Sequence, residues 1–277
     1  KALNQSLKDL DRANESLITL NNSLEELVQD RTFQLNKEKE IVEIQNLEIK
    51  RSIQYAKRIQ ASILPTQSYI RQTLPDSFIY YHPKDIVSGD FYWFTQIGHK
   101  AVIAAVDCTG HGVPGAFMSI IGYTALNYII NDKKILEPSV ILKELDKQVR
   151  TSINQQGANI ENSTDGMELG ISVIDFQTNK IEYSGANRPM YIYTKNELHK
   201  ITTSKNSIGG DREGNVKKEF KTFRHQFQTG DLFYLLSDGY VDQFGGPRGK
   251  KFMSKNIIDW KGNEEQVDDI LVIGVRL

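Results

Sequence analysis

The first 63 residues contain neither glycine nor proline, and this constrains the fold more than any other feature of the sequence. Leucines recur every seven residues in the first half of this segment, at Leu3, Leu10, Leu17 and Leu24, with Leu20 and Leu27 three residues after two of them. Heptad spacing of this kind is typical of a helix that packs along an apolar seam against a partner helix. The sequence therefore predicts a coiled-coil helix over residues 1–63, about 90 Å long at a rise of about 1.5 Å per residue.

The frame of this heptad seam shifts by four residues near the middle of the helix. Beyond Leu27, apolar residues again recur every seven positions, at Val28, Leu35, Val42, Ile49, Ala56 and Ile63. A four-residue shift is a stutter, which unwinds a coiled coil locally without ending it. The companion positions of the second seam are more polar and include Arg31, Glu38, Gln45 and Ser52.

Two interpretations of this helix are open. A single apolar stripe needs a partner, and the simplest partner is a second copy, so we expect a homodimer through the coiled coil. The helix is then either a passive dimerisation stalk or a linker that transmits a signal, because a stutter and polar seam positions leave two packings close in energy. The stretch LEELVQDRTFQL also resembles signalling helices that connect sensors to outputs in bacterial receptors.

Composition argues against several classes of function. The formal net charge is −1 with a pI near 6.6, and no cluster of Lys and Arg interleaved with aromatic residues indicates a nucleic-acid partner. Cys108 is the single cysteine, so no intrachain disulfide can form and a cytoplasmic location is expected. No uninterrupted apolar run approaches the roughly 18 residues of a membrane span, so we expect no membrane contact from this segment. Because the sequence begins at Lys1 rather than Met, we expect a longer protein with a sensor or membrane anchor upstream.

From Pro65 onward the sequence changes to short apolar runs separated by glycine and other turn residues. Aromatic and β-branched content predicts strands near residues 78–83, 90–98, 101–107, 167–176, 180–186, 189–194, 220–228, 231–238 and 269–277. Residues 115–132 and 137–156 are predicted as helices, the second with Pro138 in its first turn. Two early helices and many short antiparallel strands indicate an α+β domain over residues 64–277, with sheets covered by helices.

Acidic residues lie beside four of the apolar segments. They are Asp90, Asp107, Asp238 and the adjacent pair Asp268 and Asp269. A single Asp at a strand end is usually a turn residue or a helix N-cap. Four such positions in one domain favour another interpretation, in which a cation holds together carboxylates that would otherwise repel, and oxygen ligands select Mg²⁺ or Mn²⁺. One cysteine and five scattered histidines argue against a zinc site.

Glycines follow Asp107 closely in the stretch VDCTGHGVPGAF, at Gly110, Gly112 and Gly115. Glycine lets the backbone turn tightly or approach a ligand closely, and this pattern is compatible with either use.

Five motifs follow one another along the second part of the chain: SGDFYW, DCTGHGVPGAFMS, GANRPMY, LLSDGYVD and VDDILVIGV. Together they resemble the motif series of the SpoIIE and RsbU branch of the metal-dependent PPM protein phosphatases, from about residue 60 to residue 277. The stretch IQASILP resembles the short helix that precedes this domain in RsbU-like proteins. The resemblance implies a PPM-phosphatase-like β-sandwich, in which two antiparallel sheets are flanked by helices and hold two Mn²⁺ or Mg²⁺ ions between them.

The resemblance also implies roles for the strand-end acids. Asp107 would bridge both metals, and the backbone carbonyl of Cys108 would bind one of them. Asp90, Asp238 and Asp268 would supply the other carboxylates, with Asp269 the poorer candidate. Asp107 and Asp238 are thus the predicted catalytic residues. A two-metal site makes hydroxide available near neutral pH and stabilises charge on phosphorus during in-line attack, so no covalent phosphoenzyme is needed.

Other residues of the motifs have two interpretations each. His111 could donate a proton or hold a water near the metals, or it could only pack the turn. Arg188 could reach a phosphate as a fork donor, or be a surface arginine after a strand. The Cys108 thiol is expected to pack as a small buried group. In this phosphatase branch the helices after the GHG turn are thought to act as a switch, so the coiled coil could control the placement of Asp107 and Asp238.

We therefore expect a Mn²⁺- or Mg²⁺-dependent phosphoserine/phosphothreonine protein phosphatase of bacterial signalling, regulated through its coiled-coil linker. By resemblance, its phosphoprotein substrate is an anti-sigma-factor antagonist of the STAS type. The alternative is a catalytically silent signalling adaptor, which predicts broken metal ligands, whereas all the expected carboxylates are present. One departure is the short connection between LLSDGYVD and VDDILVIGV: either helices there are lost, or residues are missing between Asn256 and Ile257.

Overall fold

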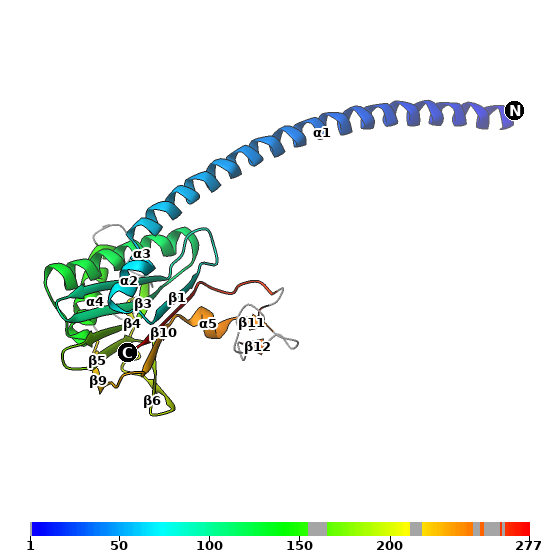
Figure 1. Ribbon diagram of the computed structural model, residues 1–277. Coiled ribbons are helices and arrows are strands. Elements are labelled where there is room, and N and C mark those ends of the chain that lie inside the picture. The colour runs from blue at the N-terminus through cyan, green and yellow to red at the C-terminus, as the bar shows by residue number, and fades with distance from the viewer. Residues whose placement is uncertain (1, 155–164, 211–217, 246–249, 252–260, 262–263) are drawn as a thin grey trace. The chain divides into compact units, whose positions relative to one another are not determined.

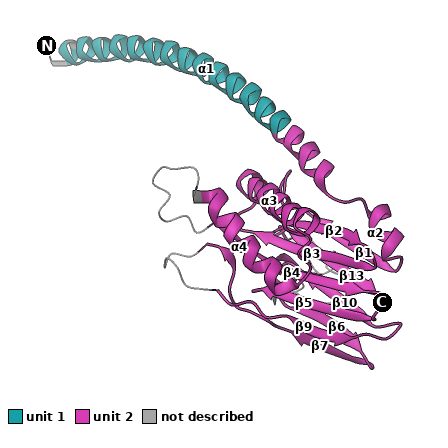
Figure 2. Ribbon diagram, turned by 90° about the vertical axis from the view of Figure 1, so that its left-hand side faces the viewer, with its two compact units in different colours: residues 1–52 teal, residues 53–277 magenta. Residues whose placement is uncertain are grey.

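The computed structural model describes residues 2–154, 165–210, 218–245, 250–251, 261 and 264–277 (Figure 1). The chain divides into two compact units, Lys1–Ser52 and Ile53–Leu277 (Figure 2). The first is helical, and the second combines helices with antiparallel sheets, so the predicted α+β fold with a long N-terminal helix is confirmed. The departure expected between Asn256 and Ile257 lies outside the described residues.

Helix α1 spans Ala2–Ile63 without interruption, as the absence of glycine and proline predicts. The seam leucines are on its surface within this single chain, since Leu10, Leu17 and Leu24 are 66%, 63% and 55% exposed. An exposed apolar seam is what a coiled coil needs before it meets its partner. The pairing itself stays a prediction. The helix ends at the predicted residue, although its last turns, from Ile53, belong to the second unit.

The second unit contains helices α2 (Gln67–Thr73), α3 (Gly112–Leu126), α4 (Pro138–Asn154) and α5 (Asp238–Asp242), with the π-helix η1 (Asn127–Asp132) directly after α3. Its longer strands are β1 (Ser77–His82), β2 (Phe91–Ile97), β3 (Lys100–Cys108), β4 (Gly166–Asp175), β5 (Lys180–Ala186), β6 (Met190–Thr194), β7 (Glu197–Ile201), β9 (Phe223–Gln226), β10 (Leu232–Leu236) and β13 (Ile270–Arg276). Short strands are β8 (Ile208–Gly209), β11 (Phe244–Gly245) and β12 (Lys250–Lys251). Every predicted strand and helix is present, and α2, α5, β7, β8, β11, β12 and the π-helical end of the first predicted helix are additional.

Two sheets form the framework of this unit. One is five-stranded in the order β1-β13-β10-β6-β7, and the other is six-stranded, with the order β2-β3-β4-β5-β9 and β8 paired to β4. All the ladders between these strands are antiparallel. Figures 1 and 2 show α3 and α4 on one side of the six-stranded sheet.

The core has two main layers because strand residues alternate between the two faces of each sheet. Between the sheets, Ile103 and Ile181 of the six-stranded sheet pack in one buried cluster with Phe233 and Ile273 of the five-stranded sheet. A second buried cluster joins the opposite face of the six-stranded sheet to the helices, and it includes Val102, Val106, Leu126, Ile141 and Leu145. The six-stranded sheet is therefore covered by buried side chains on both of its faces.

Among the described residues, the segment Gly112–Asp132, which is α3 with η1, is a long apolar helical stretch. It is 21 residues long and its most apolar window has a mean hydropathy of 1.4, so by length and composition it could cross a membrane. About half of that window, 44%, is buried, and Leu126, Ile129 and Ile130 lie in the cluster beneath the helices. Packing against the sheet therefore accounts for its apolar character.

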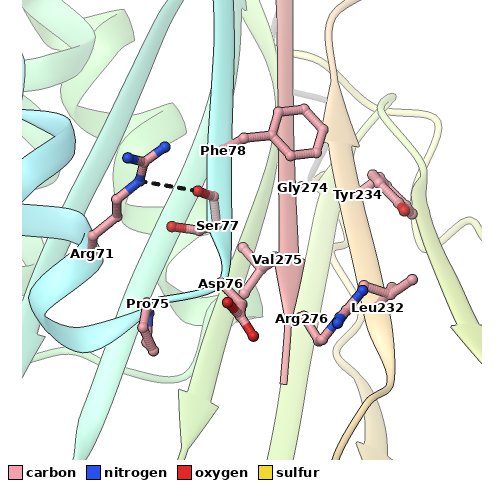
Figure 3. Close-up of a pocket in the computed structure, with 10 residues that line it drawn as sticks. All are labelled: Arg71, Pro75, Asp76, Ser77, Phe78, Leu232, Tyr234, Gly274, Val275 and Arg276. Atoms are coloured by element: carbon pink, nitrogen blue, oxygen red, sulfur yellow. Dashed lines mark hydrogen bonds between the residues drawn. The ribbon is translucent and has the colours of Figure 1, made fainter.

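The outer face of the five-stranded sheet carries a hollow of about 450 Å³ (Figure 3). Strand register places Phe78, Gly274 and Tyr234 side by side on three neighbouring strands along its floor. A β-carbon at Gly274 would collide with the exposed Phe78 ring, so a side chain there would require that ring to move aside. Arg71 of α2 closes one side, where its Nε donates a hydrogen bond to the Ser77 carbonyl at 3.3 Å.

Candidate active site

The register of the strands brings the predicted acids to one end of the sandwich. Phe91 of β2 faces Val106 of β3, so Asp90, just before β2, lies beside Asp107 near the end of β3. In the other sheet, β10 and β13 are antiparallel neighbours. Asp238 is the first residue of α5 and is separated from the end of β10 by Ser237, and Asp268 lies just before the start of β13. The four positions proposed from sequence are thus at strand ends, two in each sheet.

Asp90 and Asp107 are acids in a setting that disfavours their charge. Asp90 is 3% exposed, and its Oδ2 has no hydrogen-bond partner among the residues that the structure describes, although Ser237 lies near enough to lower the pKa of this carboxyl. Burial, and next the charge of Asp107, raise the pKa of Asp90 well above its usual value. Burial also raises the pKa of Asp107 to about 7, against a lowering by Arg188 and together with a further rise from Asp238. A partnerless buried carboxylate beside a second one fits a divalent cation with oxygen ligands.

Arg188, from the loop between β5 and β6, lies among three acids. Its Nη2 donates to Oδ2 of Asp107 at 2.5 Å and to Oδ2 of Asp238 at 2.7 Å. The same nitrogen is 3.0 Å from Oε2 of Glu168. The Arg188 side chain is only 13% exposed, so these are largely desolvated charge-assisted contacts. Of the two interpretations from sequence, the surface arginine is therefore excluded.

The backbone around Arg188 is fixed by its neighbours. The Tyr183 hydroxyl donates to the Arg188 carbonyl at 2.5 Å. Gly185 passes so close to that carbonyl that a β-carbon there would collide with it. Burial raises the pKa of Tyr183 above its ordinary range, which keeps the phenol protonated as the donor. The backbone of the GANRP motif is thus held in a position from which the Arg188 guanidinium reaches the acids.

Glu168 and Asn187 belong to this site and were missed in the sequence. Glu168 lies directly opposite Asp107 in the β3–β4 ladder, and the Asn187 amide donates to its Oε1 at 2.5 Å. Asn187 has a positive φ of 54°, which turns the loop ahead of Arg188. The sequence did show Glu168 as an acid near the start of an apolar strand. It could not show which residue lies opposite Glu168, because that depends on the register of the two strands.

Asp268 and Asp269, although adjacent, have different surroundings. The buried Asp269 carboxylate accepts hydrogen bonds from the backbone N–H of Lys84 at 2.7 Å and of Gly89 at 2.8 Å. It therefore holds the loop that leads into Asp90. Asp268 is exposed, and its Oδ1 accepts from the Asp269 N–H at 2.8 Å. This difference supports Asp268 over Asp269 as a metal ligand.

His111 is half exposed and is bound to an acid that sequence reasoning did not select. Its Nδ1 lies 2.6 Å from Oδ2 of Asp85, in the loop held by Asp269. Because a carboxylate can only accept, Nδ1 carries the proton in this contact, and Asp85 fixes the orientation of the ring. Both proposed roles of His111 remain open. Cys108 is 4% exposed in the helix–sheet core, as expected of a small packing group.

The glycines after Asp107 serve close packing as well as turning. Gly110 and Gly112 have positive φ angles of 85° and 65°, a conformation that side chains rarely adopt. A β-carbon on Gly115 or on Gly89 would collide with the Gly110 carbonyl. The start of α3, the turn after β3 and the loop before Asp90 are therefore in backbone contact.

Within the described ranges, no three or more His, Cys, Asp or Glu side chains meet as a metal-binding group. The Arg188 guanidinium lies between Asp107 and Asp238, which would otherwise be the centre of such a group. The ligand set of Asp90, Asp107, Cys108, Asp238 and Asp268 therefore stays a prediction.

Comparison with known proteins extends the fold to a family. The sequence profile of the family Stage II sporulation protein E (SpoIIE) matches residues 98–276. No curated protein sequence matches the chain. Among solved structures, the SiaA-PP2C domain of Pseudomonas aeruginosa is similar with a TM-score of 0.73 and 27% identity, over 84% of this chain and 98% of that one.

Two other similar structures share less sequence and support the fold alone. The PP2C phosphatase domain and regulatory fragment of SpoIIE from Bacillus subtilis has a TM-score of 0.56 and 19% identity, over 73% of this chain and 63% of that one. The RsbU and RsbW domains of a Mycobacterium tuberculosis protein have a TM-score of 0.51 and 17% identity, over 73% and 60%. Because the profile matches most of the second unit and that unit has the fold of these PP2C domains, the chain belongs to the SpoIIE family of PPM-type phosphatase domains.

Proposed function

We propose that this chain is a Mn²⁺- or Mg²⁺-dependent phosphoserine/phosphothreonine protein phosphatase of bacterial signalling in the cytoplasm. The observation that carries the proposal is the buried Asp90 carboxylate, which lies beside Asp107 and has one oxygen without a hydrogen-bond partner in the described part of the chain. Burying such a charge is costly unless a cation compensates it. The chain belongs to a family of phosphatase domains, and in such a domain we expect these acids to bind metal ions.

Two ions would be held by the carboxylates of Asp90, Asp107, Asp238 and Asp268 and by the carbonyl of Cys108. When bound, the ions would lower the pKa of a bridging water and stabilise negative charge on phosphorus. Asp269 contributes by holding the loop that presents Asp90, through its two backbone hydrogen bonds. Arg188, which contacts Asp107 and Asp238, would bind phosphate oxygens of the substrate, a use that its planar fork of donors suits. His111, oriented by Asp85, is the candidate to move a proton at the leaving oxygen.

The proposed substrate is a phosphorylated STAS-type anti-sigma-factor antagonist, and the proposed form is a homodimer joined by the α1 seam. Regulation through α1 is supported by Gln60, which is 4% exposed near the end of that helix. Its side chain donates to the Ser88 carbonyl at 2.6 Å and to the Ser119 hydroxyl at 2.9 Å. The linker helix thus contacts both the loop before Asp90 and helix α3.

The alternative is a catalytically silent adaptor. The observation that favours it is Arg188, whose guanidinium neutralises Asp107 and Asp238 without any metal. The adaptor and the phosphatase differ in whether the acids bind divalent cations and release phosphate.

The test is hydrolysis of para-nitrophenyl phosphate by residues 1–277 with Mn²⁺, and again with chelator. A phosphorylated STAS domain is then the protein substrate, with free phosphate as the readout. Release that depends on metal supports the phosphatase. A folded protein that binds no Mn²⁺ and releases no phosphate from either substrate would instead support the adaptor.

A further inference from the structure

We propose that Arg188 is a built-in cation that competes with divalent metal for Asp107 and Asp238. The proposal rests on the proposed function, because it concerns the same carboxylates. It is carried by geometry, since one guanidinium nitrogen contacts Oδ2 of both acids, at 2.5 and 2.7 Å. Glu168, at 3.0 Å, adds a third negative charge around that nitrogen.

Arg188 and a divalent metal ion each disfavour binding of the other to these two oxygens. A guanidinium at hydrogen-bond distance and a divalent cation on the same two oxygens repel each other, and little water is present to screen them because Arg188 is 13% exposed. A metal ion that binds these two Oδ2 atoms therefore requires the guanidinium to leave them. The affinity for metal is lowered by the free energy of that displacement.

Two further observations bear on how the side chain would move. The Arg188 Nε is buried and has no hydrogen-bond partner among the described residues, so its present contacts do not satisfy the guanidinium fully. Its backbone, in contrast, is held by the Tyr183 hydroxyl and by the close approach of Gly185. An anchored backbone with an incompletely bonded side chain allows the guanidinium to swing while the loop stays in place.

Glu168 is suited to guide this movement. It is not in the predicted ligand set, it contacts Arg188, and it is itself held by the Asn187 amide. When the guanidinium leaves Asp107 and Asp238, Glu168 can retain it at the edge of the site. Arg188 would then be available to an anionic substrate only after metal has bound, which orders metal before substrate.

The experiment is Mn²⁺ titration by calorimetry of residues 1–277 as wild type, Arg188→Gln and Arg188→Lys. Arg188→Gln should bind Mn²⁺ on the order of tenfold more tightly, a typical size for coupling between two sites. Arg188→Lys keeps the charge and should stay closer to wild type. Arg224→Gln is the matched control, because Arg224 pairs with Glu137 and Glu182 outside the site.

Equal or weaker Mn²⁺ binding by folded Arg188→Gln would overturn the proposal that Arg188 competes with metal. If the wild type nevertheless binds Mn²⁺ and releases phosphate, the proposed phosphatase function still stands. Should Arg188→Gln not fold, the wild type gives the answer by nuclear magnetic resonance. Saturating Mg²⁺ should shift the Arg188 Nε and Cζ resonances, and Arg188 resonances that stay unchanged at saturation would equally overturn it.

Discussion

Asp107 shows how one residue acquires its chemistry from neighbours that are distant in sequence. Asp90 lies beside it through the β2–β3 register, Glu168 lies opposite it through the β3–β4 register, and Arg188 reaches it from the loop after β5. Burial and the nearby acids raise its pKa to about 7, while Arg188 opposes the rise. The balance between one buried cation and several acids therefore decides whether this site takes up metal.

Removing either central acid is expected to abolish catalysis. Asp107→Asn and Asp238→Asn should each lower Mn²⁺-dependent release of phosphate by at least about a hundredfold, because a neutral amide does not replace an ionised metal ligand. The dimer should persist in both variants. The measurement is para-nitrophenyl phosphate hydrolysis with Asp175→Asn, an acid in the β4–β5 turn, as the matched control. Full activity in both variants would refute the metal assignment.

Gly185 is predicted to tolerate no side chain. Gly185→Ala should lower the free energy of unfolding by about 1–3 kcal/mol, the usual range for overpacking, because the β-carbon collides with the Arg188 carbonyl and the Tyr183 hydroxyl. Urea denaturation measures this change. Tyr183→Phe removes only the hydrogen bond to that carbonyl and should cost about 1 kcal/mol. A stability of Gly185→Ala equal to wild type would mean that this loop is not fixed as described.

At the scale of elements, the end of α1 is joined to the site by hydrogen bonds of one side chain. Gln60 accepts from the Ser88 N–H at 3.1 Å as well as donating to the Ser88 carbonyl and to Ser119. Ser88 is fully buried, so no water replaces these bonds if Gln60 moves. The loop that contains Ser88 ends at Asp90 and is tied to Asp269 through Gly89. Movement of the helix can thus reach a candidate ligand within two residues.

Loss of the Gln60 side chain should therefore lower both the stability of the domain and its rate of phosphate release. Gln60→Ala leaves buried backbone groups of Ser88 unpaired, at a cost of about 1–3 kcal/mol. Phosphate release should fall at a temperature where the protein is still folded, because the loop before Asp90 loses its anchor. Thermal unfolding and hydrolysis are measured together, with the exposed Gln54→Ala of the same helix as control. A loss of stability without any change in rate would separate Gln60 from the site.

A second prediction at the scale of elements concerns the phase of the heptad seam along α1. An insertion of four residues next to Val28 rotates the upstream seam relative to the downstream seam, whereas an insertion of seven restores the phase. If the helix transmits a signal, the four-residue insertion should change the rate of phosphate release and the seven-residue insertion should change it less. Circular dichroism checks that both fold. Equal rates in all three proteins would support a passive stalk.

At the scale of the whole molecule, we predict that the exposed seam of α1 pairs with a partner helix. Leu17 and Leu24 are more than half exposed in the single chain, and burying a leucine is worth about 1.5–3 kcal/mol. A second copy would cover both at once. The fold of the second unit does not depend on this pairing, because its two buried clusters are made within Ile53–Leu277.

Charge in the seam should therefore separate the copies without unfolding the domain. The double variant Leu17→Asp and Leu24→Asp is expected to be monomeric at micromolar concentration, because two carboxylates per helix would face each other across an apolar seam. Light scattering after size exclusion gives the mass. Asn22→Asp, off the seam, should stay dimeric. A variant that remains dimeric would place the interface elsewhere.

The sequence alone determined the elements of this protein and the chemistry they offer. A stretch without glycine or proline predicted the length of α1, and runs rich in aromatic and β-branched residues located the strands, because both signals are local in the chain. The motif order identified the phosphatase family before the fold was known. Acids such as Asp90 and Asp107 were candidates because they end apolar segments.

Only the tertiary structure decided which of these groups meet. Glu168 lies opposite Asp107 because of the strand register. Asp269 accepts a hydrogen bond from the loop before Asp90, and Arg188 lies largely buried among acids rather than on the surface. Sequence could not reveal these relations, since each joins residues from different strands or loops. Their pairing is set by the registers and the packing of two whole sheets, and register is a property of neighbouring strands rather than of either strand alone.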